Sequence, residues 1–220
     1  MKKSPAMHIL IAIIIPIFII TTGMRVALSP LFFNLEYRLP NFPPDEYGFT
    51  LNDRLKWADF SIDFITGKID ADTYAAAQLA DGQSLFNERE LSHMIDVREL
   101  TLIMLWVWRA LLFLIVIAFL PFMVNKQKEP PLKPLAVGAK ITIAFIAAIL
   151  IFLIINFNQL FTSFHQIFFE GDTWLFYHTD SLIRLFPIKF WQDLFIFIGA
   201  FSLLLSAGFI YLDKKVRNLS

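Results

Sequence analysis

The chain has 220 residues, 57% of them hydrophobic, with 19 basic and 19 acidic side chains and no cysteine. Its zero formal charge provides no global basic field for binding nucleic acid. Its apolar share exceeds the roughly one half found in soluble globular proteins. The lack of cysteine excludes disulfides, thiolate nucleophiles and cysteine-ligated metals. We therefore interpret the sequence as that of a membrane protein.

Four segments could cross a bilayer, because a hydrocarbon core about 30 Å thick needs roughly 20 apolar residues in a helix. They are predicted at about 7–28, 100–124, 137–160 and 194–212. The expected fold class is an all-α membrane protein. Residues 1–220 would form a single membrane domain, a four-transmembrane-helix bundle with a partly helical extracytoplasmic segment at 29–99.

Lysine and arginine collect in three places, which predicts the orientation because cytoplasmic segments retain positive charge. These residues are Lys2 and Lys3, then Lys126, Lys128 and Lys133 in the loop 125–136, and finally Lys214, Lys215 and Arg217. Both termini and this loop, stiffened by Pro130 and Pro131, should therefore be cytoplasmic. The first span could instead be a cleaved signal peptide, with a weak small-residue site at Thr21 and Gly23.

The outer segment between the first two spans should be folded. Residues 29–44 are rich in proline and aromatic side chains, which suggests an extended run along the lipid headgroups. Thr50 and Asp53 then resemble a helix cap, followed by apolar residues at helical spacing up to Gly67. A second short helix is expected at about 72–79, ending at the turn of Asp81 and Gly82.

Asn87 and Glu90 form another capping pair, at the start of a helix that should run on into the second span. At 1.5 Å per residue, His93 lies about 40 Å along this helix from the residue before Pro121. His165 lies about 36 Å from Ile141 on the third helix. Two histidines on different helices should thus reach one depth, near the outer headgroups.

Each histidine also has a simpler interpretation. His93 shares a helical face with Arg89 and Asp96, which could be an ordinary solvated face. His165 follows Asn158 and Thr162 on one stripe, which should face the bundle interior, where His165 could be a packing residue. His8 and His178 are expected to be interfacial and solvated.

Charged residues in apolar surroundings should have partners. Arg25 and Arg184, on the outer side, could meet a phosphate, a carboxylate or a developing oxyanion. Arg109, close in sequence to Trp106 and Trp108, could be structural. The candidate supporting or substrate-binding residues are Arg25, Glu90, Asp96, Arg98, Asn158 and Arg184.

Two blocks carry a resemblance to a known family. Glu88 to Leu100 reads ERELSHMIDVREL, and Phe164 to Trp191 reads FHQIFFEGDTWLFYHTDSLIRLFPIKFW. Together with the stretch PPDEYGFT in the first outer segment, they resemble the bacterial membrane proteins that include the lipoprotein intramolecular transacylase. The resemblance spans most of the chain.

This resemblance implies an enzyme of the bacterial cytoplasmic membrane, with its active site facing outside. The transacylase moves the sn-2 acyl chain of a diacylglyceryl-cysteine lipoprotein to the lipoprotein's own N-terminal amino group, giving a lyso-form lipoprotein. His93 and His165 become the candidate catalytic residues, with His93 as the base and His165 as the oxyanion or leaving-group partner, or the reverse. The expected partners are a diacylated lipoprotein and membrane lipid, with no nucleic acid, and no cofactor or metal is expected.

Two other functions fit the same residues. Paired histidines in a helical bundle could be the axial ligands of a haem in a membrane redox subunit. A non-enzymatic scaffold could instead bind a partner through the outer segment, and its histidines would then only pack.

Overall fold

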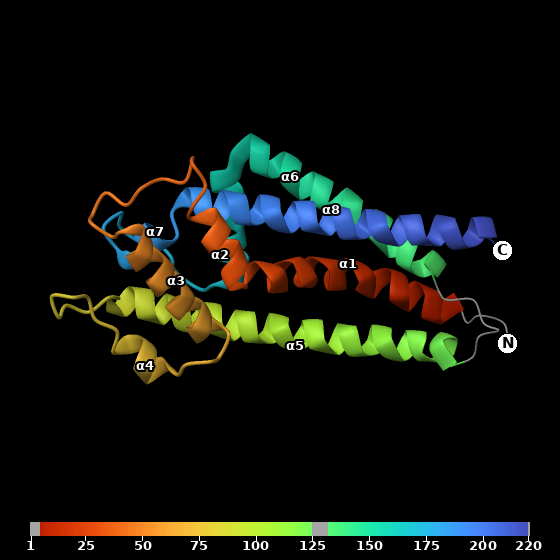
Figure 1. Cartoon of the computed structure of the whole chain (residues 1–220), viewed down its shortest axis with the longest axis horizontal. Helices are drawn as coiled ribbons and strands as arrows, with labels where there is room; N and C mark the ends of the chain where they lie inside the picture. Colours follow the sequence, from red (N-terminus) through yellow and green to blue (C-terminus); the bar gives the residue numbers. More distant parts are fainter. Residues whose placement is uncertain (1–4, 125–131, 220) are drawn as a thin grey trace. The chain divides into compact units, whose positions relative to one another are not determined.

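The computed structural model describes residues 5–124 and 132–219, which form eight helices and one isolated β-bridge. Figure 1 labels the helices in chain order. Four of them contain stretches long and apolar enough to cross a membrane: α1 (Pro5–Ala27), α5 (Glu88–Val124), α6 (Leu132–Phe168) and α8 (Ile188–Leu219). The predicted all-α class with four membrane-spanning helices is confirmed. The exact span limits and the single-domain organisation stay predictions.

Several residues used to predict the orientation have no structural description. Lys2, Lys3, Lys126, Lys128 and the pair Pro130–Pro131 lie outside the described residues. The described residues divide into two compact units. Unit 1 comprises Met1–Val26, Leu105–Phe152 and Phe195–Ser220, and unit 2 comprises Ala27–Met104 and Leu153–Leu194.

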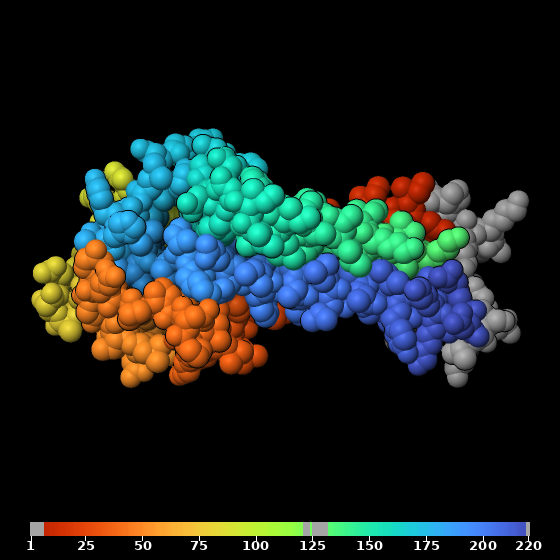
Figure 2. Space-filling view, turned by 90° about the horizontal axis from the view of Figure 1, so that it is seen from above, coloured from red at the N-terminus to blue at the C-terminus, as the bar shows by residue number. Residues whose placement is uncertain are grey.

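Unit 1 is built from the long apolar helices. Its core consists of α1 and α6 side chains, which are Ile11, Ile15, Ile19, Leu135 and Ala139. Gly138 allows α1 and α6 to approach closely, because a Cβ added there would lie 2.7 Å from the Cβ of Ile15. Gly199 brings α8 to Leu150 of α6 in the same way, and Figure 2 shows these two helices lying side by side within the unit.

Unit 2 begins with a helix that the sequence did not predict. α2 (Pro30–Glu36) occupies part of the region expected to be extended. Pro30 is tolerated there because the first turn of a helix has no intrahelical partner for its N–H group. Phe33 of α2 stacks on Phe190 at the start of α8, with ring centroids 5.5 Å apart. The orange α2 region accordingly lies beside the blue start of α8 in Figure 2.

The predicted amphipathic helix is present as α3 (Leu51–Ile65). Its capping box is formed as expected: Asp53 N–H donates to the hydroxyl of Thr50, and Thr50 N–H donates to the Asp53 carboxylate. Because both bonds are local, the start of this helix follows from the sequence alone.

The helix expected at 72–79 was predicted too long. α4 covers only Ala71–Ala75, and Gln78 then pairs with Ser84 in an isolated β-bridge. The amide of Leu79 donates to the Gln83 carbonyl, and that of Leu85 to the Ala77 carbonyl. These bonds close a tight loop around Gly82, whose φ of +83° favours glycine and confirms the predicted turn.

An aromatic cluster holds this outer segment together. Tyr74 of α4 is only 1% exposed, and its ring stacks on Phe64 with centroids 4.1 Å apart. Phe60 and Phe86 also stack on Tyr74, at 5.3 Å and 4.7 Å, and its hydroxyl shares a hydrogen bond with Ser61. The segment therefore has its own buried core, as expected for a folded region rather than a connector.

Candidate active site

His93 lies in the second turn of α5, whose start is fixed by a reciprocal cap. Glu90 N–H donates to the side-chain oxygen of Asn87 at 3.0 Å, and Asn87 N–H donates to the Glu90 carboxylate at 2.8 Å. The His93 ring is only 7% exposed, and its Nδ1 has no hydrogen-bond partner among the described residues. A buried nitrogen without a partner is costly in a folded protein, and such groups often mark functional sites.

His165 lies in the last turn of α6 and is 5% exposed. Its Nδ1 is 2.8 Å from the carbonyl oxygen of Phe161, one turn earlier in the helix. Because a carbonyl can only accept a hydrogen bond, Nδ1 must carry the proton. In the neutral ring, the lone pair therefore lies on Nε2, which is the nitrogen able to accept a proton.

The two imidazoles face each other from separate helices. Their ring centroids are 6.0 Å apart, and the ring planes differ by 24°. The sequence predicted a common depth for these residues from the helical rise, and the structure also turns them toward one another. This pair is the centre of the candidate site.

Aromatic side chains wall the pair on several sides. Phe169 and Phe176 contact the His93 ring, with centroids at 4.9 Å and 5.4 Å. Trp174 lies 4.8 Å from the His165 ring, and Phe161 lies 4.1 Å from it. Three of these residues belong to the segment 169–180 that follows α6, so this segment covers both histidines. Such walls keep water away from a reacting group and strengthen electrostatic interactions inside the site.

Glu90 and Arg98 support the site from α5 through backbone contacts. The Glu90 carboxylate accepts the amide of Leu182, in α7 (Ser181–Leu185), at 2.7 Å. Arg98 donates to the carbonyls of Phe64 and Ile69 at 3.0 Å and 2.6 Å. These two carbonyls lie at the end of α3 and just before α4 in the outer segment. Both residues thus tie other elements to α5 through backbone atoms.

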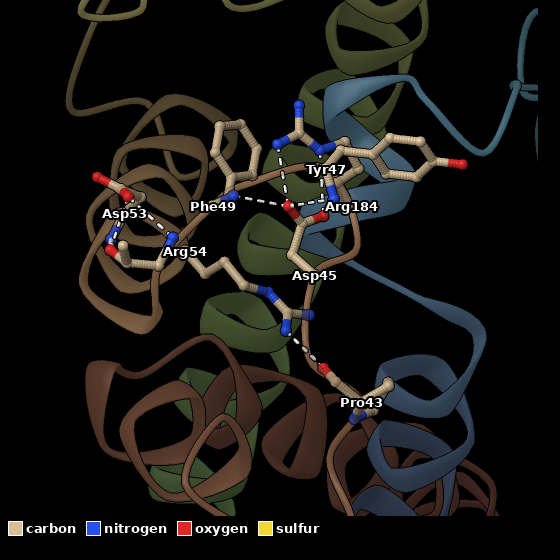
Figure 3. A network of polar contacts seen from close by, with 8 residues as sticks. Pro43, Asp45, Tyr47, Phe49, Asp53, Arg54 and Arg184 are labelled. Atoms are coloured by element: carbon tan, nitrogen blue, oxygen red, sulfur yellow. Dashed lines mark hydrogen bonds and ion pairs between the residues drawn. The ribbon is translucent and has the colours of Figure 1, made fainter.

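Arg184 has a carboxylate partner, one of the three possibilities left open by the sequence. Figure 3 shows its guanidinium against Asp45, with Nε and Nη2 at 3.1 Å and 3.0 Å from the two carboxylate oxygens. The Asp45 side chain is 2% exposed and that of Arg184 is 11% exposed. This buried pair leaves Arg184 unsuited to meeting a phosphate in the structure as described.

The remaining candidates are not gathered at the histidine pair. Asn158 is exposed, two residues after Asn156, whose backbone leaves helical geometry (φ −157°, ψ 84°). Asp96 is partly exposed, and it lies near Glu99 and Glu170 rather than in a hydrogen bond to His93. Arg25 is exposed in unit 1, and Arg109, also exposed there, lies 5.2 Å from the Trp106 ring.

Sequence reasoning missed Asp45, Trp174 and Phe176. The stretch PPDEYGFT that contains Asp45 contributed only to the resemblance, and 139 residues separate Asp45 from Arg184. Gly171 offered a weak signal for these aromatic residues, because a glycine just past a helix predicts a turn; in the structure its φ is +68°. Among the described residues, no group of three or more histidine or carboxylate side chains is arranged to hold a metal ion.

Comparison with known proteins identifies the chain. Residues 9–191 match the family Lit, described as lipoprotein intramolecular transacylase. The chain belongs to this family. The transacylase family match covers both histidine blocks and the PPDEYGFT stretch, and it confirms the predicted resemblance. The chain is therefore a multi-pass membrane acyltransferase, and the haem-subunit and scaffold interpretations are set aside.

Solved structures support the fold of this family member. The structure of the transacylase Lit from Bacillus cereus is similar, with a TM-score of 0.77 at 22% identity, covering 98% of this chain and 99% of that chain. A histidine-to-arginine variant of the same protein gives a TM-score of 0.65 at 23% identity, with coverage of 98% and 96%. An uncharacterized protein of Aquifex aeolicus (strain VF5) is 27% identical over 203 residues, covering 89% of this chain and 88% of its own length.

Proposed function

We propose that this transacylase moves the sn-2 acyl chain of a diacylglyceryl-cysteine lipoprotein to the lipoprotein's own N-terminal amino group. The observation that carries the proposal is the pair His93 and His165, stacked at 6.0 Å inside aromatic walls. The product is a lyso-form lipoprotein with an N-acyl cysteine. Because the amine and the ester belong to one molecule, holding them close supplies much of the rate enhancement.

The reaction needs one proton moved between two substrate atoms. An N-terminal amine has a pKa of about 8, so at neutral pH it mostly carries an extra proton, which must leave before the nitrogen can attack the ester carbon and which is released to solvent. A carbon–nitrogen bond then forms, the carbon–oxygen bond to glycerol breaks, and a second proton passes from the nitrogen to the glycerol oxygen. One imidazole can act as base and then as acid in this sequence.

We assign this acid–base role to His165, the reverse of the arrangement first preferred from the sequence. The support is its Nδ1–H bond to the Phe161 carbonyl, which leaves Nε2 as the proton acceptor. His93 then donates a hydrogen bond to the oxyanion of the tetrahedral intermediate. A well-placed donor of this kind is worth about 2.7–4 kcal/mol of transition-state stabilisation.

The aromatic walls explain why transfer would win over hydrolysis. A water molecule at the ester carbon would compete with the amine, and the rings of Phe169, Trp174 and Phe176 exclude it from the histidine pair.

The proposal includes the orientation of the protein: termini in the cytoplasm and the histidine pair at the outer leaflet. The basic residues near the end of α8 support it, as does the packing of α1 in unit 1, where Ile15 and Ile19 are fully buried. The latter also supports retention of the first span. Because the chain has no native cysteine, single cysteines introduced at Asn52 and Lys215 can be labelled from each side of intact cells. Labelling of Lys215→Cys from outside would refute this orientation.

An acyl-transfer assay on a purified diacylated lipoprotein tests the reaction. Mass spectrometry of its N-terminal peptide should show one acyl chain moved from glycerol to nitrogen, without change in total mass. His93→Ala and His165→Ala should each lower the rate about 100-fold or more. His178→Ala, which removes an exposed histidine, is the matched control and should be fully active. Full activity of either folded His93 or His165 variant would refute the mechanism.

A further inference from the structure

The short helix α7 is held by three tethers from different parts of unit 2. The Tyr37 hydroxyl donates to the Leu185 carbonyl at 2.6 Å, the Glu90 carboxylate accepts the Leu182 amide at 2.7 Å, and Arg184 pairs with Asp45. A helix of five residues has little stability of its own. The position of α7 therefore depends on these tethers.

Among these tethers, the pair of Asp45 and Arg184 is the most elaborate. Besides the two bonds to Arg184, the Asp45 carboxylate accepts the backbone amides of Phe49 at 2.6 Å and Tyr47 at 3.1 Å, and the first of these is drawn in Figure 3. The Phe49 ring lies 3.6 Å from the centre of the guanidinium. Bidentate, charge-assisted bonds of this kind fix an orientation as well as a distance. The loop 43–50 thus forms a socket for one side chain of α7.

The charge state of Asp45 suits this role. Burial would raise the pKa of Asp45, but the hydrogen bonds from Arg184 and from the Phe49 amide, together with the guanidinium charge, hold it below its ordinary value of 3.8. The pair therefore stays ionised at neutral pH.

The segment that α7 anchors is the cover of the histidine pair. Residues 169–180 run directly into α7, and they carry Trp174 against His165 and Phe176 against His93. The other polar contacts of this segment to α5 are exposed, such as Arg89 to the Leu175 carbonyl at 3.0 Å. Exposed contacts contribute little to stability. The downstream end of the cover is thus held mainly through α7.

We propose that Asp45 and Arg184 are a positioning pair of the transacylase, which sets the aromatic cover of the histidine site by fixing α7 in the socket of loop 43–50. Neither residue needs to touch the substrate. The pair acts on the walls that exclude water and align the ester, so its loss should lower turnover more than substrate binding. This inference rests on the proposed function for its effect on catalysis, but not for its effect on the cover.

The first experiment measures the cover without using activity. In Arg184→Gln and Asp45→Asn proteins, hydrogen exchange of the Leu175, Tyr177 and Asp180 amides should rise about tenfold. The amides of Leu79 and Leu85 in the β-bridge loop should exchange as in the parent. Diethyl pyrocarbonate should also modify His93 and His165 faster, as read by peptide mass spectrometry. Lys68→Gln, which removes the exposed ion pair with Asp63, is the control and should change neither measurement.

The second experiment measures transfer kinetics on the same variants. We expect kcat to fall about 100-fold with KM nearly unchanged, as a displacement near 1 Å can produce. Arg184→Lys keeps the charge but loses the bidentate hydrogen bonds to Asp45, so its kcat should lie between those of the parent and Arg184→Gln. If Arg184→Gln does not fold, Arg184→Lys is used for the test instead.

Unchanged exchange and unchanged histidine modification in the folded variants would overturn the proposal, as would an equal rise in exchange throughout unit 2. If hydrogen exchange rises locally in the variants but the parent protein transfers no acyl chain, the positioning pair is upheld and the proposed function is refuted. The two failures are thus distinguishable.

Discussion

Replacing Glu90 by glutamine tests whether its carboxylate holds two elements together. The residue is 2% exposed, and its two oxygens accept different amides: Oε1 that of Leu182 and Oε2 that of Asn87. Glutamine has nearly the same shape but offers only one acceptor oxygen. Its NH2 group would face one of the two backbone donors, so one bond must be lost and one buried N–H must lose its partner.

The expected cost of Glu90→Gln follows from these two losses. A hydrogen bond to a charged group contributes about 1.5–3 kcal/mol, and a buried unsatisfied donor costs about 1–3 kcal/mol. Because the neighbouring structure can relax, we expect the free energy of unfolding to fall by about 2–4 kcal/mol. Glu90→Ala, which loses both bonds, should be at least as damaging.

The assay is reversible unfolding in mixed detergent micelles, with Glu88→Gln as the matched control. Glu88 lies in the same helical turn but is exposed, and its replacement should change stability by no more than about 0.5 kcal/mol. Equal stability of Glu90→Gln and the parent protein would refute the role of the carboxylate as a double acceptor.

Three further predictions concern other parts of the chain. Burial, with a hydrogen bond to Asp193, raises the pKa of Glu36 from 4.5 to about 7; the contribution of Glu36 to stability is therefore present at acidic pH and lost as the pH rises through about 7. Melting temperatures measured from pH 5 to pH 8 should fall more steeply in the parent than in Glu36→Gln, and parallel curves would contradict this. Gly138→Ala should destabilise the protein by about 1–3 kcal/mol in the same micelle assay, because its Cβ would lie 2.8 Å from the Ala12 carbonyl, whereas Gly208→Ala meets nothing within 4 Å and should not. Arg98→Gln should loosen the contact of α5 with the Phe64 and Ile69 carbonyls, which would appear as faster hydrogen exchange at Lys68 and Ile69; unchanged exchange there would argue against this tether.

The sequence predicted those features that depend on neighbouring residues. The caps at Thr50 and Asn87 were correct because each is closed by bonds between residues three apart. The common depth of His93 and His165 followed from the constant rise of a helix. Their approach to 6.0 Å needed the rotation of both helices, which periodicity does not fix.

The features that the sequence did not reveal depend on distant partners or on a local break. Asp45 and Arg184 are both ordinary outer-segment residues until the fold joins them. Asn158 was predicted to share a stripe with His165, but its side chain is exposed whereas His165 is buried, and the non-helical backbone at Asn156, just before this stretch, could not be seen in the sequence. α2 was missed because its proline and aromatic residues are equally compatible with an extended chain.

The hydrogen bond between His165 and its own helix has a consequence for how the enzyme could be inhibited. Because Nδ1 donates to a backbone oxygen, only Nε2 of the imidazole is free to accept or give a proton, and the ring cannot relay a proton through Nδ1 to bulk solvent. The proton that Nε2 takes from the attacking amine must therefore be passed to the glycerol oxygen from that same atom. A lipid-linked electrophile aimed at this site should accordingly alkylate Nε2 alone.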